Sequence, residues 1–168
     1  MRRVIPAKKV KLLLRNKDGD VELVGGAGVD VVRRRYRIES IPTRVFTPKY
    51  GDIVVAKLNA DGALEFQRKF ADGDFETNAL VYSKASVFRP LVRWLAQSFG
   101  AVARRISAPK LFAEGFLATG LIVVAVPKRI GFARMARSAE RRFIGVLSLA
   151  REGSEQLKRL KKLAKLLP

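Results

Sequence analysis

Residues 77–152 carry apolar patterns of two kinds, and their order limits the possible folds more than any other feature of the chain. Four short apolar runs have strand character, and two longer segments carry apolar residues at helical spacing. In chain order these are strand 79–82, helix 87–99, strand 101–106, strand 121–126, helix 132–144 and strand 146–149. This is the order of the split β-α-β, or ferredoxin-like, fold.

The ends of the first of these helices carry local signals. Ser86 is placed to cap its N-terminus, Pro90 is tolerable only in a first turn, and Gly100 is placed to stop it. We therefore expect the helix to begin between Val87 and Arg89 and to end at Phe99.

Residues 1–76 read as short strands separated by turns. Residues 10–14 alternate, a turn cluster follows at 16–20, and 53–58 and 63–70 form a hairpin around Asn59-Ala60-Asp61-Gly62. The run Gly25-Gly26-Ala27-Gly28 reads as a flexible turn before a strand at 31–38. In the second hairpin strand Leu64, Phe66 and Phe70 are expected to share one face. Such a pattern predicts a small curled sheet or barrel.

Residues 153–168 predict a basic amphipathic helix with Ser154 as its cap. Its apolar stripe consists of Leu157, Leu160, Ala164 and Leu167. The leucines either dock on the core or face an anionic surface. The expected class is thus α+β, with a β-barrel-like module (1–76), a ferredoxin-like module (77–152) and this helix.

The charge balance is strongly basic. Lys and Arg number 34 against 15 Asp and Glu, which gives a formal charge of +19, and 48% of the residues are hydrophobic, which excludes a disordered basic tail. Residues 1–75 hold 16 basic and 10 acidic residues, whereas 76–168 hold 18 and 5. A folded chain with this field attracts polyanions, and nucleic acid is the first partner to consider. The alternative is a charge that serves solubility alone.

Cysteine and histidine are absent from the sequence. This excludes disulfides, thiolate–zinc sites, cysteine nucleophiles and histidine acid/base catalysis. The glycine run lacks the Gly-Lys-Ser/Thr ending of a phosphate loop, and the pairs Asp18/Asp20 and Asp72/Asp74 read as turns rather than cation ligands. We expect no enzymatic activity, no metal and no cofactor.

Arginines recur at helical spacing in both predicted helices. Arg134, Arg137 and Arg141 share one face, and Arg89 and Arg93 share another. The helices of a split β-α-β unit cover the same side of the sheet, so the two rows could merge into one surface. Solvated helix faces are the alternative, but residues 128–142 hold six basic residues against one acid, Glu140, so intrahelical ion pairs cannot account for them.

A second basic row lies in the expected strand 31–38, where Arg33, Arg35 and Arg37 would face away from Val32, Tyr36 and Ile38. Its alternative role is to protect an edge strand from unwanted pairing. Trp94 and Tyr36 are expected in the core rather than on an aromatic RNA-stacking surface. The candidate nucleic-acid-binding residues are Arg33, Arg35, Arg37, Arg89, Arg93, Arg104, Arg105, Arg134, Arg137, Arg141, Arg142, Lys158, Arg159, Lys161, Lys162 and Lys165.

Apolar stretches that could direct the chain to a membrane are short. The run at 12–14 is too short for a secretory signal, and 116–126 falls below the roughly 20 residues of a membrane span. We expect a cytoplasmic protein.

The runs Tyr36–Pro42, Tyr50–Val54 and Asp61–Phe66 resemble the first half of an uncharacterised bacterial family, a domain of unknown function. The resemblance covers residues 10–152 and implies a small β module followed by a ferredoxin-like module. Family members often carry a Ser/Gly/His-rich stretch where this chain has 72–77 without histidine, so no role of that stretch transfers. Some members are suspected immunity proteins, which implies binding of a protein partner.

The strongly basic charge and the arginine rows together predict a non-enzymatic protein that binds structured RNA, as in a ribosomal particle. No recognition-helix pattern, coiled coil or zinc finger is present to read a DNA groove. An immunity or adaptor protein that recognises an acidic surface is the alternative, and attachment to an anionic membrane surface ranks third.

Overall fold

The computed structural model describes residues 9–17, 19–45, 47–82, 84–106, 120–144 and 147–150. The chain is α+β, as the sequence predicts. It divides between Asp74 and Phe75 into two compact units, two residues before the expected boundary, because a strand begins at Phe75. The helix expected at 153–168 lies outside the described residues.

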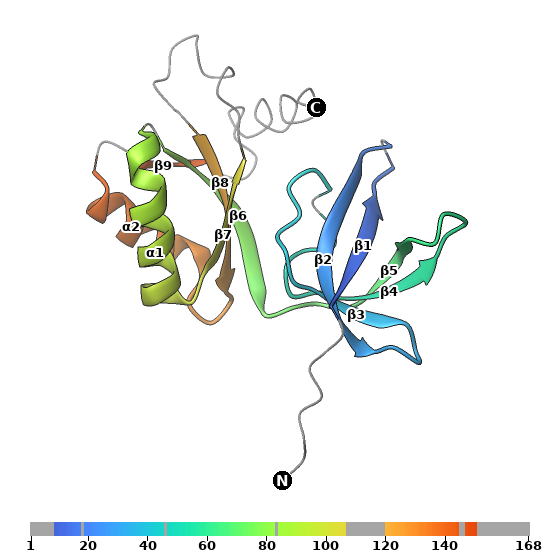
Figure 1. The fold of residues 1–168 in the computed structure, drawn as a ribbon. Coiled ribbons are helices and arrows are strands. Elements are labelled where there is room, and N and C mark those ends of the chain that lie inside the picture. The colour runs from blue at the N-terminus through green and yellow to red at the C-terminus, as the bar shows by residue number, and fades with distance from the viewer. Residues whose placement is uncertain are drawn as a thin grey trace. The chain divides into compact units, whose positions relative to one another are not determined.

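The first unit is a closed barrel whose five strands follow one another in sequence order (Figure 1). The strands are β1 (Lys9–Arg15), β2 (Val21–Asp30), β3 (Arg35–Ile38), β4 (Ile53–Leu58) and β5 (Leu64–Ala71). Consecutive strands are antiparallel, and β1 closes the barrel on β5 in parallel. Alternating directions over an odd number of strands require this parallel pair. The interior is filled by Leu12, Leu14, Val24, Tyr36, Ile38, Val45, Val54 and Ala56.

The glycine run at 25–28 is not a turn, and that expectation is wrong. All four residues lie within β2, between β1 and β3. A Cβ atom at Gly26 would lie 2.5 Å from Cδ1 of the fully buried Leu12. Glycine therefore serves the close packing of the barrel wall at this position, which a local sequence pattern does not distinguish from a flexible turn.

The strand expected at 31–38 is half the expected length. Residues 31–34 form a turn in which the Arg33 N–H donates to Asp30 Oδ1 at 3.0 Å and Arg34 has a φ of 57°. Val32 is consequently 93% exposed instead of facing the core. The Asp30 side chain satisfies the turn backbone, and this local bond outweighs the strand preference of the valines.

Phe70 also departs from its expected position. Two β-bulges interrupt β5: Gln67 is the extra residue between the pairs Ala56–Phe66 and Val55–Arg68, and Phe70 is the extra residue between the pairs Val54–Lys69 and Ile53–Ala71. A bulge changes the direction of a side chain relative to regular alternation. Phe70 is 43% exposed rather than sharing the inner face with Phe66.

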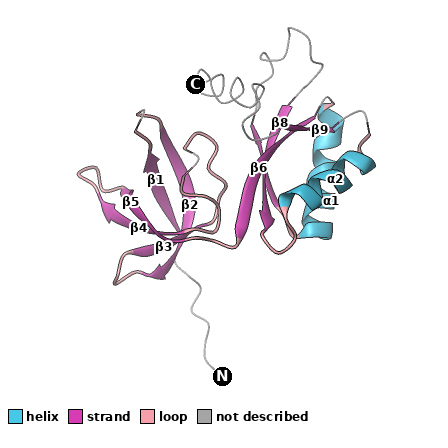
Figure 2. Ribbon diagram, turned by 180° about the vertical axis from the view of Figure 1, so that it is seen from behind, coloured by secondary structure: helices cyan, strands magenta, loops and turns pink. Residues whose placement is uncertain are grey.

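The second unit is a four-stranded antiparallel sheet with two helices on one face (Figure 1 and Figure 2). The sheet order is β7-β8-β6-β9. In chain order the elements are β6 (Phe75–Tyr82), the single turn η1 (Ala85–Val87), α1 (Phe88–Phe99), β7 (Val102–Ile106), β8 (Gly120–Pro127), α2 (Phe132–Arg142) and β9 (Leu147–Ala150). Each predicted element is present, within a few residues of its expected bounds.

The helices pack on alternate residues of the central strands. Fully buried side chains of the sheet and of both helices meet in one core that includes Leu80, Tyr82, Leu91, Leu95, Ile122, Val124, Met135 and Ala139. The other face of β8 is also buried, because its apolar residues Leu121 and Val123 are only 5% and 4% exposed. Burial of both faces explains the uninterrupted apolar run of this strand.

Helix ends follow the expected signals in part. Gly100 ends α1 with a φ of 59°, and its N–H donates to the Ala96 carbonyl at 3.0 Å. Ser86 does not cap the helix: it lies in η1, and Val87 occupies the cap position without a side-chain bond. The 3-10 turn moves the helix start past the serine. Helix α2 ends at Arg142, two residues before the expected end.

Candidate nucleic-acid interface

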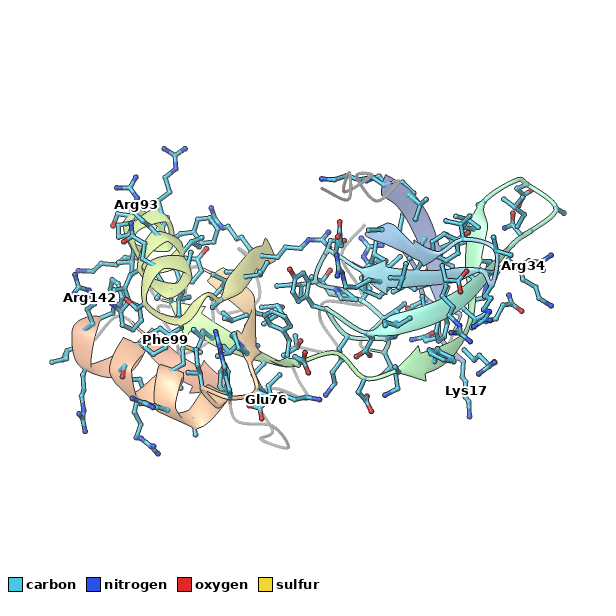
Figure 3. All side chains as sticks on the ribbon, turned by 90° about the horizontal axis from the view of Figure 1, so that it is seen from below. Lys17, Arg34, Glu76, Arg93, Phe99 and Arg142 are labelled. Atoms are coloured by element: carbon cyan, nitrogen blue, oxygen red, sulfur yellow. The ribbon has the colours of Figure 1, made fainter. Side chains whose placement is uncertain are left out.

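The outer side of α1 is basic because its apolar residues turn toward the sheet. Leu91 and Leu95 are fully buried, whereas Arg89 and Arg93 are exposed on the opposite side of the helix. Arg93 extends from α1 away from the sheet (Figure 3). The three- and four-residue spacing thus produces the exposed basic row that the sequence predicts on this helix.

The outer side of α2 has the same construction. Arg134, Arg137 and Arg141 are exposed, and Met135 and Ala139 are buried beneath them. Within the described parts of the chain, no carboxylate lies within ion-pair distance of these three arginines or of the two on α1. The five residues Arg89, Arg93, Arg134, Arg137 and Arg141 are called the helix arginines below.

Arg142, unlike the other arginines of α2, contacts a side chain of α1. Its guanidinium carbon is 5.9 Å from the Trp94 ring, which makes edge contacts with Phe99 at 5.1 Å and Phe143 at 5.8 Å. Trp94 is half-buried against the core, as expected. Arg142 therefore places a planar cation beside the aromatic contact between α1 and the end of α2, and its side chain is exposed.

The two arginines of β7 point to opposite faces of the sheet. Arg105 is on the helix side, where its guanidinium carbon lies 5.8 Å from the Tyr82 ring and 5.6 Å from the Phe88 ring. Arg104 pairs with Val123 and faces the other way. Of this predicted pair, only Arg105 shares the helix-covered face with the helix arginines.

Tyr82 is the titratable group affected by this arrangement. Burial raises the pKa of its hydroxyl above the ordinary value of 10.0, and the nearby positive charge of Arg105 lowers it in part. The ring is fully buried and stacks on Phe88 at 5.9 Å. Tyr82 is thus a neutral core residue near neutral pH and offers no charge to a ligand.

The barrel row Arg33, Arg35 and Arg37 has partners within its own unit. Arg33 lies 3.6 Å from Asp30, Arg37 lies 3.0 Å from Glu39, and the guanidinium carbon of Arg35 lies 3.7 Å from the centre of the Phe70 ring. Two of the three charges are therefore compensated. Protection of an edge strand is excluded as their role, because β3 is hydrogen-bonded on both sides, to β2 and β4.

The sequence-predicted residues consequently fall into four groups, one of which is Arg104 alone, on the face of the second unit's sheet opposite to Arg105. The helix arginines, Arg105 and Arg142 lie on the helix-covered side of the second unit, and the barrel row belongs to the first unit. The predicted lysines and arginine of the last segment lie outside the described residues: Lys158, Arg159, Lys161, Lys162 and Lys165.

The sequence does not predict the exposure of Phe70 or its contact with Arg35. The position of Phe70 depends on the two β-bulges of β5, and no turn residue marks these irregularities in the run Gln67-Arg68-Lys69-Phe70. Among the residues that the structure describes, no three His, Cys, Asp or Glu side chains gather closely enough to hold a metal ion. Neither described helix is long and apolar enough to cross a membrane.

No protein-family model matches this sequence, and no curated protein matches it. Among solved structures, the chain is similar to a hypothetical protein from Neisseria gonorrhoeae with a TM-score of 0.47 and 15% sequence identity. The similarity covers 84% of this chain and 91% of that one.

Proposed function

We propose that this protein binds nucleic acid without catalysing a reaction, and that its ligand is structured RNA, as in a ribosomal particle. The observation that carries the proposal is the set of five helix arginines. They are exposed on two helices that lie on the same face of one sheet, and no described carboxylate compensates them. Arginine suits this role because its planar fork binds a phosphate through two hydrogen bonds.

The shape of this surface favours RNA over a DNA groove. Two helices that lie against a sheet form a broad layer, whereas reading of a major groove needs a single protruding helix or ribbon. Structured RNA is recognised mainly by shape and by phosphate contacts. We further propose that the second unit is ferredoxin-like, on the basis of its element order and its sheet order. We also propose that the protein acts in the cytoplasm.

Binding of a protein partner, as by an immunity or adaptor protein, is the second candidate function. The β2–β3 turn favours it, because Val31 and Val32 are 54% and 93% exposed at the end of the barrel beside Arg33 and Arg34. Exposed apolar residues with basic neighbours suit an acidic protein surface.

Fluorescence anisotropy over a range of salt concentrations tests the proposal. The full chain is titrated onto an RNA hairpin, duplex DNA and an unrelated acidic protein. In one variant Arg134, Arg137 and Arg141 are all changed to Ala. In the control variant three exposed basic residues of the barrel, Lys11, Arg15 and Lys17, are all changed to Ala. Both lose the same charge. We expect the first variant alone to lose RNA affinity, with a salt slope smaller by about 2 to 3.

The proposal is wrong if both variants bind RNA alike, or if the acidic protein binds more tightly than RNA. The second outcome would favour the partner-binding function.

A further inference from the structure

We infer that Phe70 and Arg35 form a stacking site for an unpaired base of single-stranded RNA on the outside of the barrel. This inference rests on the proposed function and adds to it a second site, in the other unit, for a different feature of the ligand.

The aromatic ring and the guanidinium already form a stack. The Arg35 guanidinium carbon lies 3.7 Å from the centre of the Phe70 ring, and the ring is 43% exposed. Arg35 covers part of the ring, and the exposed remainder of the Phe70 side chain is accessible to a ligand. The two β-bulges of β5 place Phe70 there, and bulges recur where a strand directs a side chain to a functional position.

Positive charge surrounds this stack. Arg35 pairs in register with Val55, and Val55 pairs with Arg68, so the two arginines lie on either side of one valine on the same face. Neither arginine has a described carboxylate within ion-pair distance. The two positive charges lie on β3 and β5 with β4 between them, and like charges repel each other when no anion is bound between them. An anion beside Phe70 would relieve this repulsion.

Lys69 is unsuited to that role. Its ammonium group is bonded to Asp72, and this hydrogen bond raises the pKa of the lysine. The uncompensated charge beside Phe70 is therefore carried by guanidinium groups, which can stack on a base as well as bind a phosphate.

A ligand with one flat ring and an adjacent negative charge fits this arrangement. A nucleobase can extend the stack on the open side of Phe70 or Arg35, and the neighbouring phosphate can bind Arg68. The base must be unpaired, because bases within a helix are already stacked on their neighbours. The geometry therefore points to single-stranded segments or loops rather than to RNA stems.

The test uses the full chain with two RNA ligands, an oligouridine strand of about 12 nucleotides and a hairpin stem with a minimal loop. Phe70→Leu removes the aromatic ring but keeps an apolar side chain. We expect its affinity for the strand to fall about fivefold or more at an unchanged salt slope, and its affinity for the stem to stay within about twofold. Leu58→Ala is the control, since Leu58 is a 70% exposed apolar residue of β4.

Arg35→Lys and Arg68→Ala separate stacking from charge. Arg35→Lys keeps the charge and loses the planar group, so it should weaken strand binding without changing the salt slope. Arg68→Ala should reduce that slope by about 0.7, the value for one phosphate contact of a single strand.

A fluorescence experiment measures stacking directly. Trp94 is the only tryptophan in the chain, so the Trp94→Phe variant has no tryptophan fluorescence. In that variant, the fluorescence of Phe70→Trp reports on the stacking site alone. Bound oligouridine should quench this tryptophan, and the stem should not.

Strand binding by Phe70→Leu that equals the wild type, or no quenching on saturation with the strand, would overturn the stacking site. If the wild type still binds the stem, the proposed function stands. Failure of the wild type to bind either RNA would refute both.

Discussion

The side chain of Glu76 on β6 caps helix α2 at Phe132: its Oε2 accepts a hydrogen bond from the Phe132 backbone N–H at 2.9 Å. Gly131 precedes the helix and has no side chain to serve as a cap. A carboxylate at a helix N-terminus also interacts favourably with the helix dipole. The helix that carries three of the five helix arginines is therefore anchored to the sheet by a residue 56 positions earlier in the chain.

Loss of this cap should destabilise the second unit. We expect Glu76→Ala to lower the free energy of unfolding by about 1 kcal/mol, the usual value for an N-cap. Trp94 fluorescence during urea unfolding measures it, since Trp94 of α1 contacts Phe143, which directly follows α2. Asp61→Ala, which removes an exposed carboxylate of the barrel, should leave this transition unchanged. Equal transitions for both variants would contradict the role of Glu76.

The second unit could be predicted well from sequence because its signals are long and local. Leu91 and Leu95 repeat at helical spacing, Gly100 stops the helix, and residues 121–126 are apolar throughout. The exposure of the helix arginines follows from the same spacing. Glu76 was not recognisable as a cap, because nothing local links it to Phe132.

The errors in the barrel arise from contacts between distant parts of the chain. The local sequence around Gly26 predicts a turn, and only the contact with Leu12 shows that it belongs to a packed strand. Regular alternation predicts that Phe70 is buried, and the two β-bulges of β5 change that alternation. The partners of the basic row show the same limit. Arg35 meets Phe70 across the barrel surface, a contact that depends on strand order and register.

The two neighbouring glycines of β2 should respond differently to alanine. A Cβ at Gly26 would lie 2.5 Å from Leu12 Cδ1 and 3.1 Å from the Arg37 carbonyl oxygen, whereas at Gly25 the nearest atom is Ser40 Oγ at 3.5 Å. We expect Gly26→Ala to destabilise the barrel by about 1 to 3 kcal/mol, as overpacking does, and Gly25→Ala to cost less than about 1 kcal/mol. Circular dichroism during thermal unfolding distinguishes them. A larger loss for Gly25→Ala would contradict the close approach of Leu12 to Gly26.

Glu22 should be the carboxylate on which the barrel depends most. It is 7% exposed, and its two oxygens accept hydrogen bonds from the backbone N–H groups of Thr43, Arg44 and Val45 at 2.7 to 3.1 Å, and from the Thr43 hydroxyl at 3.0 Å. Bonds to a buried charge are strong, and a lost acceptor leaves buried donors unsatisfied.

We therefore expect Glu22→Gln, which turns an N–H group toward those donors, to cost about 2 to 3 kcal/mol in urea unfolding. The matched control is Glu65→Gln, because Glu65 forms an exposed ion pair with Arg15 at 3.4 Å and should contribute less than about 1 kcal/mol. Similar losses for the two variants would refute the anchoring role of Glu22.

Tyr82 should make the second unit sensitive to alkaline pH. Burial holds its pKa above the ordinary value of 10.0 in the folded protein, and Arg105 offsets part of this increase. An unfolded tyrosine loses its proton near pH 10, whereas the buried one retains it, so the unfolded state binds fewer protons above that pH. The stability due to Tyr82 is thus fully present below about pH 10 and is lost as the pH rises through the higher folded pKa.

Unfolding in urea, followed by Trp94 fluorescence from about pH 8 to about pH 11, tests this in the wild type and in Tyr82→Phe. The variant has no hydroxyl to ionise, so its stability should fall less steeply above about pH 10, while the lysines common to both proteins contribute equally. Arg105→Gln should shift the phenolate absorbance transition of Tyr82 to still higher pH, because it removes the charge that lowers the pKa. Identical pH slopes for wild type and Tyr82→Phe would mean that Tyr82 ionises as freely as an exposed tyrosine.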